Sequence, residues 1–230
     1  MLQMPPSDLI ESLAEEPKIF PSFAAITNYP HPISPDFYNL SEEEKIALIE
    51  EKFYDIMLIL GLDVADESLR KTPHRIAKMY VKEIFHGLDL QKFPEVSLIK
   101  DLFHAEDPGM ILVNDIEFTS FCEHHFVPFQ GKAHVAYIPN GQVIGLSKIN
   151  RIVNYFAKRP QIQERLTAQI ADSLAIILET ENIAVTLVAK HACVSSRGIQ
   201  DQSSSTRTNF LRGDFSNNDC LRKEFFESIR

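Results

Sequence analysis

The chain has 230 residues, of which 44% are hydrophobic and 24% are charged. This composition is typical of a globular protein and excludes collagen-like, low-complexity and fully disordered chains. No uncharged apolar run approaches the roughly 18 residues that a membrane span needs. The acidic start, with no Arg before Arg70, is unlike a secretory signal or a transit peptide. We therefore expect a cytoplasmic protein without a membrane partner.

The net charge of −9 is unevenly distributed along the chain. Residues 1–69 carry 14 acidic side chains and 3 lysines, whereas residues 70–230 carry 18 acidic and 20 basic side chains. The acidity counts against a nucleic-acid partner, but a local anion site in the second region is still possible. Three cysteines are too few and too scattered for a disulfide framework, so burial, metal binding or catalysis is expected of them.

The first 40 residues contain seven of the 13 prolines and no sustained periodicity, so residues 1–40 are interpreted as a poorly ordered or loosely docked extension. A helix is predicted to begin at Ser41, because Ser41 and Glu44 have the spacing of a capping box, and to stop at Gly61. Apolar residues follow the helical 3/4 spacing between these two ends. Residues 41–109 are therefore expected to form a helical N-terminal segment.

A second helix is predicted to open at Thr72-Pro73 and to end before Gly87. From about residue 110 the pattern changes to alternating strands and amphipathic helices, so residues 110–230 are expected to form an α+β domain. The predicted elements there are strands over 110–118, 132–138, 183–190 and 203–215, a short helix around 149–156, a longer helix opened by Pro160, and a last helical turn in 223–229.

The densest chemical cluster is the sequence CEHH, in which Cys122 and His125 have a spacing suited to zinc and His124 lies between them. His191 and Cys193 follow about seventy residues later, on what is predicted to be a continuation of an alternating strand. A period of two would project both side chains to the same face. A closed Cys₂His₂ site would be structural, whereas three protein ligands and a water would be catalytic. Spacing alone does not decide between a structural zinc site, a catalytic zinc site and simple burial of these residues.

Two further clusters could bind a substrate. Ser147, Lys148 and Arg151 lie at a predicted helix start, which suits phosphate oxygens, although a solvated helix start has the same composition. Neither a Walker A loop nor a Gly-x-Gly-x-x-Gly motif is present in the sequence. Gln163 and Glu164 begin the next helix, and a carboxylate there could accept two N–H bonds from a guanine edge. Arg197 would add a cation on the metal side of such a pocket.

With these residues in view, the sequence resembles the GTP cyclohydrolase I family, in its bacterial type, from about Ser41 to the C-terminus. The stretches that carry the resemblance are TPHRIAKMYVKEIFHGLD (72–89), CEHH (122–125), GLSKINRIV (145–153), QIQERLT (161–167) and HACVSSRGI (191–199). Several long motifs in the right order make a chance match very improbable.

The resemblance implies that Cys122, His125 and Cys193 are the zinc ligands, with one Zn²⁺ per subunit. It leaves His124 and His191 for proton transfer, and thereby favours an open, catalytic site. The other implied roles concern GTP: Gln163 and Glu164 for the guanine ring, Ser147, Lys148, Arg151 and Arg197 for the ribose and triphosphate, and Lys78 for the phosphates bound by a neighbouring subunit.

The family also implies an architecture and a reaction. The domain over 110–230 would have the tunnelling fold (T-fold), with antiparallel strands, two helices and a barrel completed by oligomerisation, in a homodecamer with active sites at subunit interfaces. The activity would be the opening of the GTP imidazole ring at C8, with release of formate and formation of 7,8-dihydroneopterin triphosphate. The alternatives are a non-catalytic purine-binding relative with a structural zinc and another T-fold enzyme acting on a pterin or deazapurine.

Overall fold

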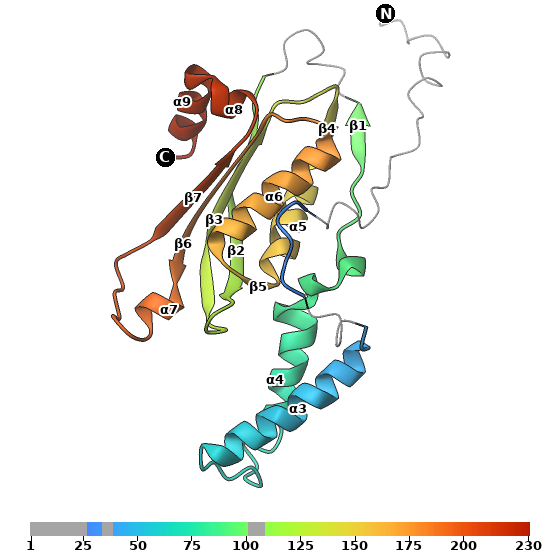
Figure 1. Cartoon of the computed structure of the whole chain (residues 1–230), viewed down its shortest axis with the longest axis vertical. Helices are drawn as coiled ribbons and strands as arrows, with labels where there is room; N and C mark the ends of the chain where they lie inside the picture. Colours follow the sequence, from blue (N-terminus) through green and yellow to red (C-terminus); the bar gives the residue numbers. More distant parts are fainter. Residues whose placement is uncertain (1–26, 34–38, 101–108) are drawn as a thin grey trace, which may run out of the picture.

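The computed structural model describes residues 27–33, 39–100 and 109–230, and its centre is a five-stranded sheet with the order β5-β2-β3-β6-β7 (Figure 1). Neighbouring strands are antiparallel except that β5 runs parallel to β2. The strands are β2 (Ile111–Cys122), β3 (Pro128–Tyr137), β5 (Pro160–Gln161), β6 (Ile183–His191) and β7 (Thr206–Leu211). With the helices described next, this is the mixed α+β architecture that the sequence predicts.

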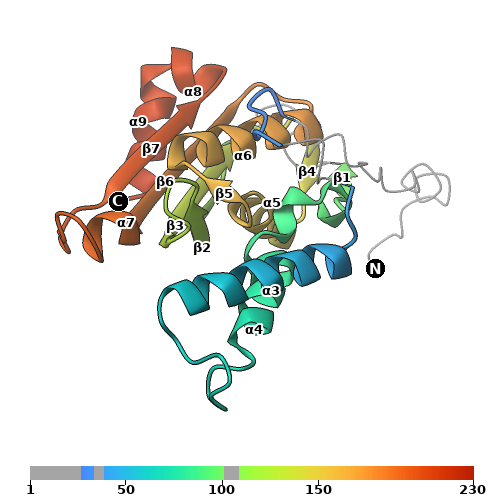
Figure 2. The same ribbon diagram turned by 60° about the horizontal axis from the view of Figure 1, so that its bottom comes forward.

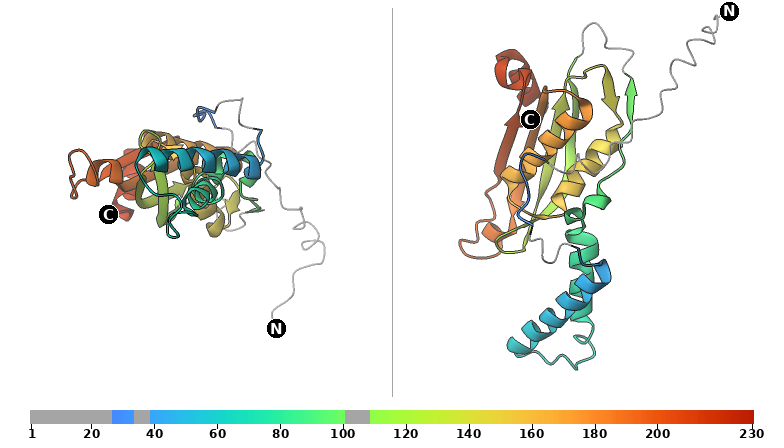
Figure 3. Two further views of the ribbon diagram at one scale, coloured as in Figure 1. Left: turned by 90° about the horizontal axis from the view of Figure 1, so that it is seen from below. Right: turned by 45° about the vertical axis from the view of Figure 1, so that its right-hand side comes forward.

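The two faces of the sheet are covered differently. Two helices, α5 (Leu146–Ala157) and α6 (Gln163–Leu178), lie side by side on one face (Figure 3, right). Their apolar residues pack on strand residues such as Val135 and Val185 in the main core. The neighbouring Ala136 and Ala184 point to the opposite face, where they pack under α8 (Asp214–Asn217) and α9 (Asp219–Ser228). Alternate side chains of the strands thus pack into two separate hydrophobic cores on opposite faces of the sheet.

The helical segment extends from one end of the sheet, away from α8 and α9 (Figures 1 and 2). Its first helix, α3 (Glu42–Ile59), begins with the predicted capping box: Glu44 N donates to Ser41 Oγ at 3.2 Å and Ser41 N donates to Glu44 Oε2 at 2.8 Å. Gly61 follows the helix with a φ of 80°, as a helix stop requires. Within the described residues, no helix combines the length and the apolar character needed to cross a membrane.

The second predicted helix is interrupted. It forms α4 (Thr72–Met79) and then a π-helical turn, Tyr80–Ile84, in which the Tyr80 ring packs edge-on against Phe53, Phe85 and Phe126. Gly87 follows the end of this helical segment, as the sequence predicts, and it also has a packing role. Gly87 lies in a short 3-10 turn, and its N–H donates to Lys158 O at 2.9 Å, so a side chain there would collide with the end of α5. The remaining short elements are η3 (His86–Leu88), η4 (Leu90–Lys92) and the paired strands β1 (Leu98–Lys100) and β4 (Gln142–Ile144).

Several predicted boundaries in the second half of the chain need correction. Pro160 does not open a helix: it forms β5 with Gln161, paired to the end of β2, and α6 begins at Gln163. Pro160 has no N–H, so an edge strand suits it as well as a helix start does. The strand predicted over 110–118 continues to Cys122, and the strand predicted over 132–138 already starts at Pro128. The strand predicted over 203–215 is confined to β7, and the predicted last helical turn is a ten-residue helix, α9.

Part of the N-terminal extension is docked on the domain. Asn28 donates from its backbone N to Asp172 Oδ2 at 2.7 Å, and Gln169 Nε2 donates to Tyr29 O at 2.7 Å. The Tyr29 ring also packs edge-on against Phe210 at 5.6 Å. Residues 27–33 therefore lie against α6 (the blue segment in Figure 1). Residues 1–26 and 34–38 of the expected extension lie outside the described residues.

Candidate metal centre and active site

The sequence CEHH and the following Phe126 form a tight turn at the end of β2, called the metal turn below. Cys122 is 6% exposed, and its N–H donates to Val127 O at 2.9 Å across the turn. The next residue, Glu123, donates its N–H to Gln161 O at 2.9 Å, so β5 supports the turn from its outer side. The short parallel pairing of β5 with β2 thus fixes where the first metal-binding residue lies.

Phe126 closes this turn with a φ of 52°, a conformation that is unfavourable for a bulky side chain. Its ring packs edge-on against Tyr80 and Phe85, at centroid distances of 6.2 and 5.1 Å. Phe85 also packs against Phe121, the residue that precedes the first cysteine. The aromatic residues of the helical segment therefore hold the turn in a conformation that the local sequence alone would not favour.

Cys122, His125 and Cys193 could hold a metal ion, because their ligand atoms all lie within 4.8 Å of one another. Two sulfurs and an imidazole form a donor set that suits zinc, and three protein ligands leave a fourth position open. Burial, together with the adjacent Cys122 sulfur, raises the pKa of the Cys193 thiol. A bound divalent cation would reverse this effect, because a coordinating thiol is deprotonated. The three residues predicted as ligands therefore fit the ion.

The reasoning that placed His191 and Cys193 on one strand face was wrong. β6 ends at His191, and Cys193 lies in a four-residue helix, α7 (Ala192–Ser195). The change of conformation brings Cys193 to the metal cluster, whereas the His191 ring stacks on Phe129 at 4.6 Å. His191 Nε2 is also 2.8 Å from Gln163 Oε1. A strand pattern extended past His191 does not predict that the side chains of His191 and Cys193 lie apart.

The two histidines expected to transfer protons have different surroundings. His124 is largely exposed, with Nδ1 3.6 Å from Cys122 Sγ and Nε2 4.0 Å from Glu123 Oε1. His191 is half-buried, and burial lowers its pKa, while the negative charge of Glu164 acts in the opposite direction. A lowered pKa keeps the imidazole neutral near pH 7, so that it can accept a proton. The geometry thus leaves His124 outside the ligand set but beside Cys122, and it leaves His191 outside the set, against Phe129 and Gln163.

Gln163 and Glu164 differ in burial and in the hydrogen bonds that they form within the chain. Gln163 is buried, and its Nε2 lies 3.1 Å from both Leu187 O and Thr206 O while its Oε1 contacts His191. A contact between this carboxamide and guanine would have to replace one of these bonds. Glu164 is exposed and lines a pocket of about 580 Å³ together with Tyr29, Pro30, Ile162, Arg165 and Phe210. Of the two, Glu164 is the more accessible to a ligand.

The residues expected to bind phosphate do not all lie together. Arg197 is near the metal cluster, with NH1 3.0 Å from His125 Nε2, and Lys78 is exposed on α4. The other three begin α5, whose last residue, Ala157, is three positions before β5, the strand that pairs with Cys122 at the metal turn. Ser147 is therefore roughly 15 Å along the helix axis from that end. The residues of this second group are Ser147, Lys148, whose Nζ donates to Glu95 O at 2.7 Å, and Arg151.

Comparison with known proteins decides the family. The sequence profile described as GTP cyclohydrolase I matches residues 49–230, which is most of the chain. The chain belongs to the GTP cyclohydrolase I family. The protein named GTP cyclohydrolase 1 of Tolumonas auensis is 56% identical over 187 residues, which cover 81% of this chain and 86% of that protein. The corresponding protein of Escherichia coli O1:K1 / APEC is 51% identical over 199 residues, covering 86% and 89%.

Among solved structures, the apo form of the archaeosine synthase QueF-Like matches with a TM-score of 0.40 and 15% sequence identity. The match covers 47% of this chain and 97% of that chain. This likeness is too slight to assign a fold. The membership in the GTP cyclohydrolase I family therefore depends on the sequence profile and on relatives that are 51–56% identical over the aligned residues.

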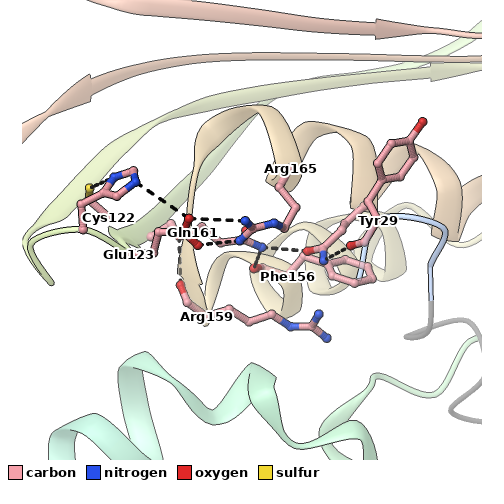
Figure 4. Close-up of polar contacts among 10 residues, drawn as sticks. Tyr29, Cys122, Glu123, Phe156, Arg159, Gln161 and Arg165 are labelled. Carbon is pink, nitrogen blue, oxygen red and sulfur yellow. Dashed lines mark hydrogen bonds and ion pairs between the residues drawn. The ribbon is translucent and has the colours of Figure 1, made fainter. Parts of the chain in front are cut away.

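In this member of the GTP cyclohydrolase I family, sequence reasoning missed an ion pair beside the metal turn. Arg165 NH1 lies 2.6 Å from Glu123 Oε2, and NH2 lies 3.3 Å from Oε1 (Figure 4). The hydrogen bond from Arg165 is the main reason why the pKa of Glu123 is lowered. Forty-two residues separate the two side chains, so no local spacing could have revealed the pair.

No sequence pattern predicted that the docked N-terminal segment, residues 27–33, lies close to this site. Gln169, which binds Tyr29 O, accepts a hydrogen bond from Gln161 Nε2 at 2.8 Å, and Gln161 O in turn accepts from the metal turn (Figure 4). His31 lies close to Arg165 and Glu123, and its buried Nδ1 has no hydrogen-bond partner among the described residues. Burial, followed by the charges of Arg165 and Arg159, lowers the pKa of His31 to about 4.

Proposed function

We propose that the protein is a zinc-dependent GTP cyclohydrolase I, which opens the imidazole ring of GTP at C8, releases formate and forms 7,8-dihydroneopterin triphosphate. Family membership supports the activity, and one observation carries the chemistry: Cys122, His125 and Cys193 converge while His124 stays outside the group. A purely structural zinc site needs no additional proton carrier. We expect one Zn²⁺ per subunit and, from the sequence, a cytoplasmic location.

The zinc ligands define where the chemistry takes place. When bound, zinc supplies a Lewis acid that lowers the pKa of water towards neutrality. His124 or His191 protonates the purine ring nitrogen as water attacks C8, so negative charge does not build up on the heterocycle. After ring opening, a second hydrolysis releases C8 as formate, and the ribose rearranges before the new ring closes. These later steps need proton transfer near the ribose, which two histidines beside the metal can provide.

Substrate binding is divided among the remaining residues. Glu164 accepts two N–H bonds from guanine, and Gln163 orients His191 through the 2.8 Å contact between Oε1 and Nε2, with the base contact predicted for Gln163 as a further role. Arg197, whose NH1 lies 3.0 Å from His125 Nε2, binds the ribose and triphosphate from the metal side of the pocket. Ser147, Lys148 and Arg151 bind the ribose and triphosphate, and Lys78 reaches the phosphates bound by a neighbouring subunit.

We also propose a homo-oligomer, a decamer in this family, in which T-fold barrels are completed across subunits. Three observations support it. The start of α5 is roughly 15 Å along the helix axis from the end that leads to β5 and the metal turn, so these two parts of the site meet more readily between chains. Within the described residues, no strand pairs with the outer edge of β7. The apolar end of α3 is exposed, with Ile59 at 83% and Leu60 at 71%.

The test is formate release from GTP by purified, zinc-loaded protein, with ATP as the control substrate. We expect one formate per GTP consumed and none from ATP, because Glu164 recognises donors that adenine lacks. No formate from GTP despite bound zinc would contradict the proposal. It would favour the non-catalytic purine-binding alternative, which predicts GTP binding without turnover.

A further inference from the structure

We propose that Glu123 and Arg165 are positioning residues for His124, which together fix the direction in which its imidazole ring presents a proton. The inference rests on the proposed function, since the proton-transfer role of His124 is part of it. Neither Glu123 nor Arg165 is a metal ligand or a substrate contact in that function. Glu123 lies in the metal turn and Arg165 contacts it from α6, and Figure 4 shows them as consecutive members of one chain of polar contacts.

The ion pair has the geometry of an orienting contact. Two nitrogens of Arg165 face the two oxygens of Glu123, at 2.6 and 3.3 Å, so the plane of the carboxylate is fixed as well as its position. The side chains are only 17% and 24% exposed. Partial burial weakens the competition from water, which makes the pair stronger than an ordinary surface ion pair.

The fixed carboxylate faces the ring that is proposed to carry the proton. Glu123 Oε1 is 4.0 Å from His124 Nε2, and Cys122 Sγ is 3.6 Å from Nδ1 on the other side of the ring. His124 is 63% exposed, so little packing restrains it otherwise. A proton carrier oriented by a third group is a recurring arrangement in enzymes, and such contacts often tighten when the substrate binds.

The turn has other supports, which separates positioning from simple folding. The backbone of Glu123 is bound to Gln161 O at 2.9 Å, and Gln161 is linked through Gln169 to Tyr29. Removing the charge of Arg165 therefore leaves the turn attached to β5 and α6. The expected consequence is a misplaced His124 ring in a folded, metal-binding protein.

The experiment compares Arg165→Gln, Glu123→Gln and the double variant with the control Arg212→Gln. Arg212 forms a partly buried ion pair with Asp172, also on α6 but away from the metal turn. For each zinc-loaded protein we would measure kcat and KM for GTP, zinc content and thermal unfolding. We expect the two single variants to lose about 10- to 100-fold in kcat with KM and zinc content nearly unchanged, as for other residues that orient a metal-site group. The kcat of the double variant should be no lower than that of the less active single variant, because both substitutions remove the same contact.

Further outcomes decide the proposal. Arg165→Lys should recover part of kcat, since it keeps the charge. Unchanged kcat with a raised KM would overturn the inference and make Arg165 a substrate contact, and loss of zinc or of folding in step with kcat would make the pair structural. Crystal structures of zinc-loaded wild type and Arg165→Gln test the ring position directly, even if the wild type releases no formate. The same His124 orientation in both structures would overturn the inference, whereas absence of formate in the wild type alone would count against the proposed function.

Discussion

The metal turn and the start of α5 carry the two largest groups of predicted site residues, and they differ in how far one chain completes them. The metal turn is tied to β5, to the aromatic residues of the helical segment and to α6, and its three candidate ligands already lie within 4.8 Å of one another. Ser147 and Arg151 at the start of α5 are exposed, and Lys148 Nζ donates to Glu95 O there. One region is thus preorganised for chemistry by its own chain, whereas the other presents its cations on an exposed helix start.

This difference indicates which part of the site depends on assembly. Preorganised ligands and proton carriers need contacts fixed to a fraction of an ångström, which a folded domain supplies. Phosphate binding needs charge in the right place, which a second chain can bring when two copies meet. We therefore expect damage to the metal turn to remove chemistry, and damage to the start of α5 to weaken binding.

The largest effect is expected for Cys193→Ala. This change removes one of three ligands, so zinc content and formate release should both fall to background. Cys220→Ala is the matched control, because Cys220 is an exposed thiol on α9, away from the cluster. Zinc analysis and the formate assay check both variants. Full zinc content in Cys193→Ala would show that the ion is held elsewhere.

His124→Ala should separate the metal from the chemistry. It removes a proton carrier and no ligand, so zinc should stay bound while kcat falls by roughly 10²- to 10⁴-fold. His86→Ala, which alters a half-buried histidine of the helical segment, should leave kcat unchanged. If His124→Ala instead loses the metal, the roles of His124 and His125 have been exchanged.

Arg151→Ala is expected to have an intermediate effect that depends on the ligand. A lost charge-assisted bond to phosphate costs about 1.5–3 kcal/mol, which is roughly 10- to 100-fold in GTP affinity. Guanosine has no phosphate, so its affinity should hardly change. Titration calorimetry with both ligands checks the difference, and Arg70→Ala serves as a surface control. An equal loss for GTP and guanosine would contradict a phosphate role.

The smallest expected effect concerns the docked N-terminal segment and its response to pH. The pKa of His31 is about 4 in the folded chain, against an ordinary value of 6.5, because the residue is buried close to Arg165 and Arg159. Between pH 6.5 and 4 the unfolded chain binds a proton that the folded chain does not, so the free energy of unfolding should fall as the pH falls. Glu123 opposes this shift in part.

His31→Leu should make the free energy of unfolding less dependent on pH in this window, because the titrating group is gone. Urea unfolding of wild type and variant at pH 7 and pH 4.5 measures the change. His74→Leu is the control, since His74 is exposed and contacts Glu50 on the surface of the helical segment. The same pH dependence in wild type and His31→Leu would show that His31 is not responsible.

The sequence predicted those parts of the fold and site that depend on local patterns. The capping box at Ser41, the alternating strands and the spacing of Cys122 and His125 are short-range signals, and each is present as expected. The π-helical turn after Met79 and the end of β6 at His191 depend on tertiary packing and were missed. The pairing of Glu123 with Arg165 could not be predicted either, because it joins two elements that meet only in the folded chain.

The measurement that most directly tests this division of the site is complementation between two defective chains. Cys193→Ala removes the metal half, and the double variant Lys148→Ala/Arg151→Ala removes the phosphate half. Each protein alone should release almost no formate from GTP at low concentration. If the halves come from different chains, oligomers co-assembled at equal amounts should recover about one quarter of the wild-type rate, because one site in four receives two intact halves. A mixed oligomer no more active than its two parents would contradict the account and place both halves of each site in one chain.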